Sequence, residues 1–199
     1  LGDAALRARA HAAGVAVLYL HALNPYGFSF WRRTTQENVD LNRNFQAFDS
    51  AHAPLPANPA YDEIAHLVVP TQWPPTPEAQ AAEAAYIAER GERAWQSAIS
   101  RGQHAHPEGL FFGGQAPTWS NVTLRHVLRD HGRHCARLGW IDLHTGLGPS
   151  GVGERIFASI DEGPALDRAR AWWGAGVTSV FQGSSNSIPL HGPIQFALP

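Results

Sequence analysis

The hydrophobic pattern of the chain places short apolar runs between longer helix-like stretches. Residues 15–20 are an unbroken apolar run that follows an Ala-rich and Arg-rich opening and Gly14. A run of this kind suits a strand that is buried on both faces, as in a parallel sheet. Residues 139–144 have strand character too, and residues 155–160 form a third expected strand.

Helices are expected between these strands. Thr76, Pro77 and Glu78 provide an N-cap, a proline at the first helical position and an early acid, which predicts a helix to about Ser100. Further helices are expected from the cap at residues 117–121 to about residue 137, and over residues 164–174. The alternation favours a layered α/β fold, and we expect residues 1–199 to form a single domain. We expect the polar residues 32–45 to be an extended loop, and the Pro-rich residues 49–77 to be an ordered loop excursion.

Composition narrows the possible partners. The chain is 44% hydrophobic and 16% charged with a net charge of -2, so it can bury a core, and we expect neither nucleic acid nor an anionic membrane as a partner. No run of 18 apolar residues occurs, and the single Cys135 rules out an internal disulfide. Because there is no Met and the chain opens at Leu1, we interpret the sequence as an excerpt, and compartment and oligomeric state stay open.

His144 is the first candidate for chemistry. It stands at the expected carboxyl end of a strand, before a Gly-rich loop. In open α/β sheets, ligands bind at this edge, and an imidazole there can hold a metal with room for substrate. A single histidine near a strand end is more often structural, so both interpretations remain open.

A second candidate is the loop over residues 32–44. It carries three arginines and two asparagines beside an aspartate: Arg32, Arg33, Arg43, Asn42, Asn44 and Asp40. Guanidinium groups suit substrate carboxylates and oxyanions. The alternative is a solvated loop whose arginines pair with Asp40 or Glu37. No Gly-x-Ser-x-Gly elbow occurs, so a serine hydrolase is poorly supported.

Four segments, residues 24–27, 31–34, 39–45 and 141–144, resemble in order the active-site segments of zinc carboxypeptidases of the carboxypeptidase A superfamily. Residues 113–121 and 147–151 resemble more closely a bacterial, carboxypeptidase-like branch of uncharacterised function. The likeness covers nearly the whole chain. It implies a three-layer α/β/α fold with a mixed, largely parallel sheet, incomplete at both ends.

The resemblance also implies residue roles. His144 would be the third zinc ligand, and Arg32 would polarise the scissile carbonyl and stabilise its oxyanion. Asn42 and Arg43 would hold the substrate's terminal carboxylate. Asp40 would accept a hydrogen bond from a ligating histidine and fix its tautomer.

The same resemblance places the remaining machinery outside the sequence. The two other ligands of the one expected Zn²⁺, from a His-x-x-Glu motif, are expected upstream of Leu1, and the general-base Glu after Pro199. The expected activity is zinc-dependent hydrolysis of a peptide or amide bond in a substrate with a free carboxylate, either a peptide or a small N-acyl compound. The excerpt alone is not expected to be active. The alternative is a non-catalytic module that binds carboxylates or peptides and has lost the metal site.

Overall fold

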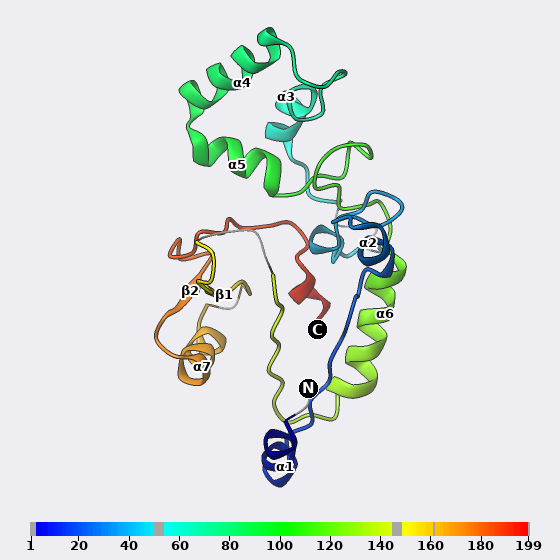
Figure 1. The fold of residues 1–199 in the computed structure, drawn as a ribbon, viewed down its shortest axis with the longest axis vertical. Coiled ribbons are helices and arrows are strands. Elements are labelled where there is room, and N and C mark those ends of the chain that lie inside the picture. Colours follow the sequence, from blue (N-terminus) through cyan, green and yellow to red (C-terminus); the bar gives the residue numbers. More distant parts are fainter. Residues whose placement is uncertain (1–2, 50–53, 145–148, 161, 199) are drawn as a thin grey trace.

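The computed structural model describes residues 3–49, 54–144, 149–160 and 162–198, and these contain more helix than strand. The elements are α1 (Ala4–Ala12), α2 (Pro25–Phe30), the 3-10 helix η1 (Leu41–Arg43), α3 (Pro59–Val68), α4 (Pro77–Arg90), α5 (Glu92–Ser100), α6 (Trp119–Val127), the π-helical turn η2 (Leu128–Gly132), β1 (Arg155–Phe157), α7 (Pro164–Trp173), β2 (Val177–Ser179) and the 3-10 helix η3 (Ile194–Ala197). Figure 1 shows α3, α4 and α5 together at one end, and α7 with β1 and β2 at one side. The described structure is therefore mixed α/β and mostly helical.

The buried apolar side chains form three separate clusters. They are Phe45, Leu124 and Ala197; Ile64, Trp95 and Ala98; and Leu166, Ala169 and Val177. A domain usually has one contiguous core. The accessible surface is 13416 Å², whereas a compact monomer of this mass would expose roughly 9,200 Å². Much apolar surface therefore lies exposed.

Capping explains the helix that the sequence predicts from Pro77. The Oγ1 atom of Thr76 accepts a hydrogen bond from the N–H of Ala79 at 3.2 Å, and Pro77 occupies the first turn. Gly91 adopts a positive φ of 86° and divides the expected helix into α4 and α5. The prediction is confirmed, with one break that only glycine accommodates without strain.

The small sheet confirms two further predictions in part. β1 pairs in parallel with β2, with Arg155 opposite Val177 and Phe157 opposite Ser179. α7 connects these strands and buries Leu166 and Ala169 against the sheet. The strand is shorter than the expected residues 155–160, whereas α7 agrees with the expected helix.

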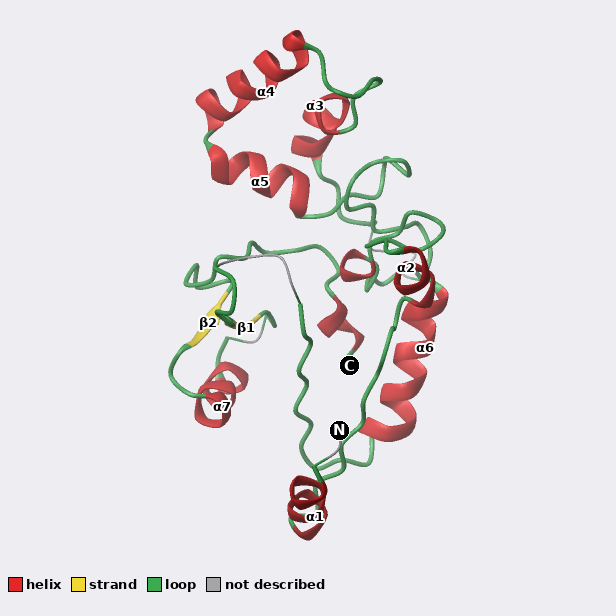
Figure 2. Ribbon diagram, viewed as in Figure 1, coloured by secondary structure: helices red, strands yellow, loops and turns green. Residues whose placement is uncertain are grey.

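Two expected strands are not strands in the described structure. Residues 15–20 and 139–144 are extended but lie in loop conformation (Figure 2). Val17 is 58% exposed and Leu143 is 91% exposed. The physical reason is the absence, within the described ranges, of a neighbouring strand to complete a hydrogen-bonded ladder. The expected three-layer arrangement around a largely parallel sheet is accordingly not found in the described residues.

Two other expectations need correction. α3 lies inside the expected loop excursion, because the side chain of Asn58 caps it at Tyr61 and Pro59 starts it. The helix expected to reach residue 137 leaves α-helical geometry after Val127 and continues only as the short turn η2. In the parts of the chain that the structure covers, no helix combines the length and apolar character needed to cross a membrane.

Candidate functional site

A buried amide fixes the loop that carries the candidate residues. The side-chain N–H groups of Asn44 donate to the carbonyl oxygens of Gly113 and Ala116 at 2.8 and 3.0 Å. Its Oδ1 accepts from the backbone N–H and the hydroxyl of Thr118 at 2.9 and 3.0 Å. Asn121 in turn donates to the Asn44 carbonyl at 2.7 Å. We call these five residues the Asn44 network, and they join residues 40–46 to residues 113–121.

Asp40 lies buried at the start of η1 and holds two neighbours. Its Oδ2 accepts from Nε of Arg33 at 2.6 Å, and its Oδ1 accepts from the N–H of Asn42 at 2.9 Å. The alternative to a substrate-binding loop was a loop whose arginines pair with Asp40 or Glu37, and Arg33 does pair with Asp40. The hydrogen bond expected from a ligating histidine to Asp40 is not made by any described residue.

Asn42 and Arg43 face the protein interior. Arg43 is 2% exposed, and its guanidinium donates to the carbonyl oxygens of Ser100 and Asn42 and lies 4.9 Å from the centroid of the Phe111 ring. Burial lowers the pKa of Arg43 to about 10, although Asp40 opposes the shift. Oδ1 of Asn42 accepts from the N–H of Ile194 at 2.9 Å. Both side chains thus have partners inside the protein.

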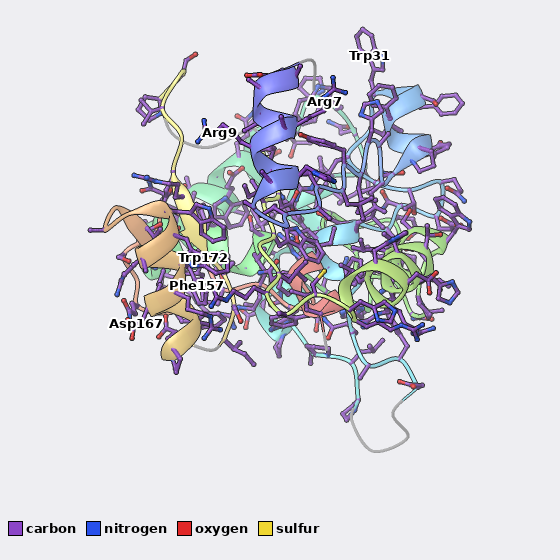
Figure 3. All side chains as sticks on the ribbon, turned by 90° about the horizontal axis from the view of Figure 1, so that it is seen from below. Arg7, Arg9, Trp31, Phe157, Asp167 and Trp172 are labelled. Atoms are coloured by element: carbon purple, nitrogen blue, oxygen red, sulfur yellow. The ribbon has the colours of Figure 1, made fainter. Side chains whose placement is uncertain are left out.

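The other two arginines face solvent. Arg32 follows Trp31, the C-cap residue of α2, which has a φ of 55°. Trp31 is 95% exposed and projects away from the body of the molecule (Figure 3). The side chain of Arg32 is exposed and makes no hydrogen bond or ion pair with another described residue. Arg33 is about half exposed and stacks 5.0 Å from the Phe111 centroid. Arg33 also lines a cavity of about 270 Å³ together with Phe111.

His144 forms a pair with Asp142. Nε2 of His144 donates to Oδ2 of Asp142 at 2.7 Å. This hydrogen bond raises the pKa of His144, burial opposes it, and the charges of Arg33 and Asp40 also act on the imidazole. The charge of Arg33 lowers the pKa of His144 and the charge of Asp40 raises it, so these two residues of the arginine loop act on the imidazole in opposite directions. Because Nε2 carries the proton, Nδ1 of the neutral ring has a lone pair.

This arrangement fits one zinc ligand. Metal-binding imidazoles commonly donate their other N–H to a carboxylate, as His144 does to Asp142. Within the described ranges no three His, Cys, Asp or Glu side chains gather in a possible metal-binding group. Thr145 and Gly146, which follow His144 in the motif, lie outside the described residues.

Two histidines, buried His104 and half-buried His191, each have a buried ring nitrogen without a partner. Nδ1 of His104 donates to the Gly114 carbonyl at 2.5 Å, so Nε2 of the neutral ring keeps a lone pair, and it has no partner. Nδ1 of His191 and Nε2 of Gln46 are likewise buried without a partner. Burial lowers the pKa of His104 and of His191, and for His191 the charge of Arg101 adds to the effect.

Sequence reasoning gave no individual role to Arg33 and Asp142. Asp142 could have been paired with His144 from the sequence, because residues i and i+2 of an extended segment lie on one face. The pairing of Arg33 rather than Arg32 with Asp40 had no such signal, since it depends on the turn at Trp31 and on the position of Phe111.

One comparison with known proteins gave a match. The model of a family described as "Protein of unknown function (DUF2817)" matches residues 2–199. No curated protein and no solved structure matches the chain.

Proposed function

This chain belongs to the DUF2817 family, whose function is unknown, and we propose that it acts in zinc-dependent hydrolysis of an amide or peptide bond next to a free carboxylate. The resemblance of four segments to zinc carboxypeptidases, described above, supports this proposal. Its substrates would be peptides or small N-acyl compounds. One observation carries it: Asp142 orients the half-exposed imidazole of His144 through a hydrogen bond of 2.7 Å, as a carboxylate commonly orients a metal-binding histidine.

His144 would hold the metal through Nδ1, with Asp142 fixing the ring tautomer. Zinc, when bound, supplies a Lewis acid that polarises a carbonyl and activates water. The proposal needs two further protein ligands beside His144, because a catalytic zinc normally takes three. The half-exposed position of His144 leaves room for substrate beside the ring.

Two arginines can act on the substrate from solvent-facing positions. Arg32 has no partner among the described residues, so its guanidinium is available to stabilise a developing oxyanion. Arg33 lines an open cavity, where the other N–H groups of its guanidinium can donate to a substrate carboxylate while Nε donates to Asp40. Asn42 and Arg43 can bind the carboxylate only if they leave Ile194 and Ser100. Arg33 is therefore added to the proposed carboxylate site.

Steady-state kinetics with an N-acyl amino acid and its methyl ester test the proposal. Zinc-loaded protein expressed from the complete gene should hydrolyse the amide of the free acid at least about tenfold more efficiently than the same amide in the ester. Arg32→Ala should lower kcat by about 100-fold, because an oxyanion donor acts in the transition state. Arg33→Ala should mainly raise KM.

The same assay separates the candidate carboxylate ligands. A rise in KM for folded Arg43→Ala without one for Arg33→Ala would assign the carboxylate to Arg43. Equal hydrolysis of the acid and the ester, or an effect of Arg32→Ala on KM alone, would contradict the proposed roles.

A second candidate function is carboxylate or peptide binding without catalysis. The exposed Arg32 and Arg33 favour it, because two guanidiniums can bind a carboxylate with no metal. Saturable binding of an N-acyl amino acid by metal-free protein, with no hydrolysis after zinc is added, would support this function over the first.

A further inference from the structure

Helix α2 lies beside the start of α6 (Figure 1). Residues of α2 and of the first turn of α6 line a second cavity of about 180 Å³. Its walls include Pro25 and Tyr26 of α2 and Trp119 of α6. Trp119 is 65% exposed. This cavity shares no lining residue with the cavity that contains Arg33, so it is a separate feature of the surface.

Most neutral polar groups around this cavity are already used. Asn24 accepts from Gly27 and donates to the Arg33 carbonyl. The Thr35 hydroxyl accepts from the N–H of Val39. The Thr118 hydroxyl belongs to the Asn44 network. These three side chains build the cavity wall and are not free to bind a ligand's hydroxyl groups, which leaves Gln36 and Ser120 as the other neutral polar residues of the lining.

The charged group at the cavity is different. Glu37 lines it, is exposed, and makes no ion pair or hydrogen bond with another described residue. No arginine and no histidine lines the same cavity. A carboxylate beside a Tyr and a Trp ring is the chemistry that recognises an ammonium group, because the aromatic faces and the carboxylate both attract a cation.

We propose that the cavity between α2 and α6 binds an alkylammonium group, such as a lysine side chain, with Glu37 as the counter-ion and Tyr26 and Trp119 as aromatic walls. The carboxylate gives the cavity its charge preference, and the rings contact the methylene groups next to the ammonium. This inference goes beyond the proposed hydrolysis and does not rest on it, since neither zinc nor a free carboxylate takes part.

Binding of Nα-acetyl-lysine methylamide tests the inference. This probe has an ammonium group but no free carboxylate, and its neutral partner is Nα-acetyl-norleucine methylamide. Titration by NMR should show saturable binding of the lysine probe and at least about fivefold weaker binding of the norleucine probe. Glu37→Gln should weaken binding of the lysine probe by a similar factor, and Trp119→Ala by about threefold or more.

Controls separate the cavity from general charge effects. Glu108→Gln removes an exposed carboxylate at the other cavity and should change binding less than about twofold. Trp119→Phe keeps an aromatic ring and should retain most of the binding. Equal affinity for the two probes, or unchanged affinity in Glu37→Gln, would overturn the inference. Binding of a methyl glycoside at this cavity in place of the lysine probe would also overturn it.

Discussion

Two regions of the molecule differ in how their backbone groups are hydrogen-bonded. One is the Asn44 network, and the other comprises the two extended segments, residues 15–20 and 139–144. In the network, side-chain amides supply the hydrogen bonds for irregular backbone, and Asn44 and Asn121 are almost fully buried. The extended segments have apolar side chains that are exposed and no ladder within the described ranges. The irregular, polar loop is thus held in place by side-chain hydrogen bonds, whereas no strand ladder holds the two apolar segments within the described ranges.

This difference divides the candidate site. Arg33, Asp40 and Arg43 lie in or beside the loop that the network fixes, and each makes a hydrogen bond to another part of the protein or to a neighbour in the loop. His144 stands at the end of an extended segment and is held by its pair with Asp142. In the half proposed to bind carboxylate, Arg33 is therefore held by Asp40, and Asn42 and Arg43 are held by internal partners, whereas the half proposed to bind metal stands on an exposed extended segment.

The largest expected effect comes from breaking the Asn44 network. Asn44→Ala should lower the free energy of unfolding by about 3–5 kcal/mol, because the buried Gly113 carbonyl, the Ala116 carbonyl and two donors of Thr118 lose their partner. Urea unfolding followed by circular dichroism measures this loss. Asn186→Ala, at an exposed position, is the matched control and should cost no more than about 0.5 kcal/mol. Equal losses would mean that the network does not hold the loop.

A matched pair of leucines tests the contrast in burial. Leu124 is 0% exposed and packs against Phe45, so Leu124→Ala should cost about 3 kcal/mol of unfolding free energy. Leu143 is 91% exposed, so Leu143→Ala should stay within about 0.5 kcal/mol. A loss at Leu143 as large as that at Leu124 would show that residues 139–144 are covered in the protein in solution, and the contrast between the regions would fail.

A smaller effect is expected from pH. Burial lowers the pKa of His104 below its ordinary 6.5 in the folded state. The unfolded chain then binds more protons, so stability is constant above this pH and falls as the pH drops below it. His191 acts in the same direction, because burial and Arg101 lower its pKa.

His104→Asn removes one of these titrations while keeping a donor for the Gly114 carbonyl. Urea unfolding at about pH 7.5 and about pH 5.5 should show a smaller acid loss in the variant than in the original protein. The raised pKa of His144 acts the other way, because its pair with Asp142 adds stability at low pH that is lost as the pH rises through the folded pKa. This contribution is small, since His144 is about half exposed. If His104→Asn lost as much unfolding free energy between the two pH values as the original protein, the contribution of His104 to the pH dependence would be contradicted.

Local sequence signals predicted the structure where local contacts decide it. Thr76 and Pro77 define the start of α4, and the helix over residues 164–173 follows its own pattern. The apolar pattern of residues 15–20 predicts burial on both faces, but a strand also needs a partner, and pattern alone does not supply one. For the site, Asp40 and Arg43 were singled out from the sequence. The inward direction of Arg43 depends on Ser100, 57 residues away, which no local pattern encodes.

The central claim is that His144 is a zinc ligand beside the arginine loop, and metal content tests it most directly. Protein expressed from the complete gene should contain about one zinc per chain after dialysis, and His144→Ala should lose it. His134→Ala is the matched control, because His134 is an exposed histidine whose ring accepts from Arg133 and not from a carboxylate, and it should keep the metal. Zinc retained by His144→Ala, or no zinc in the original protein even after incubation with a zinc salt, would contradict the account.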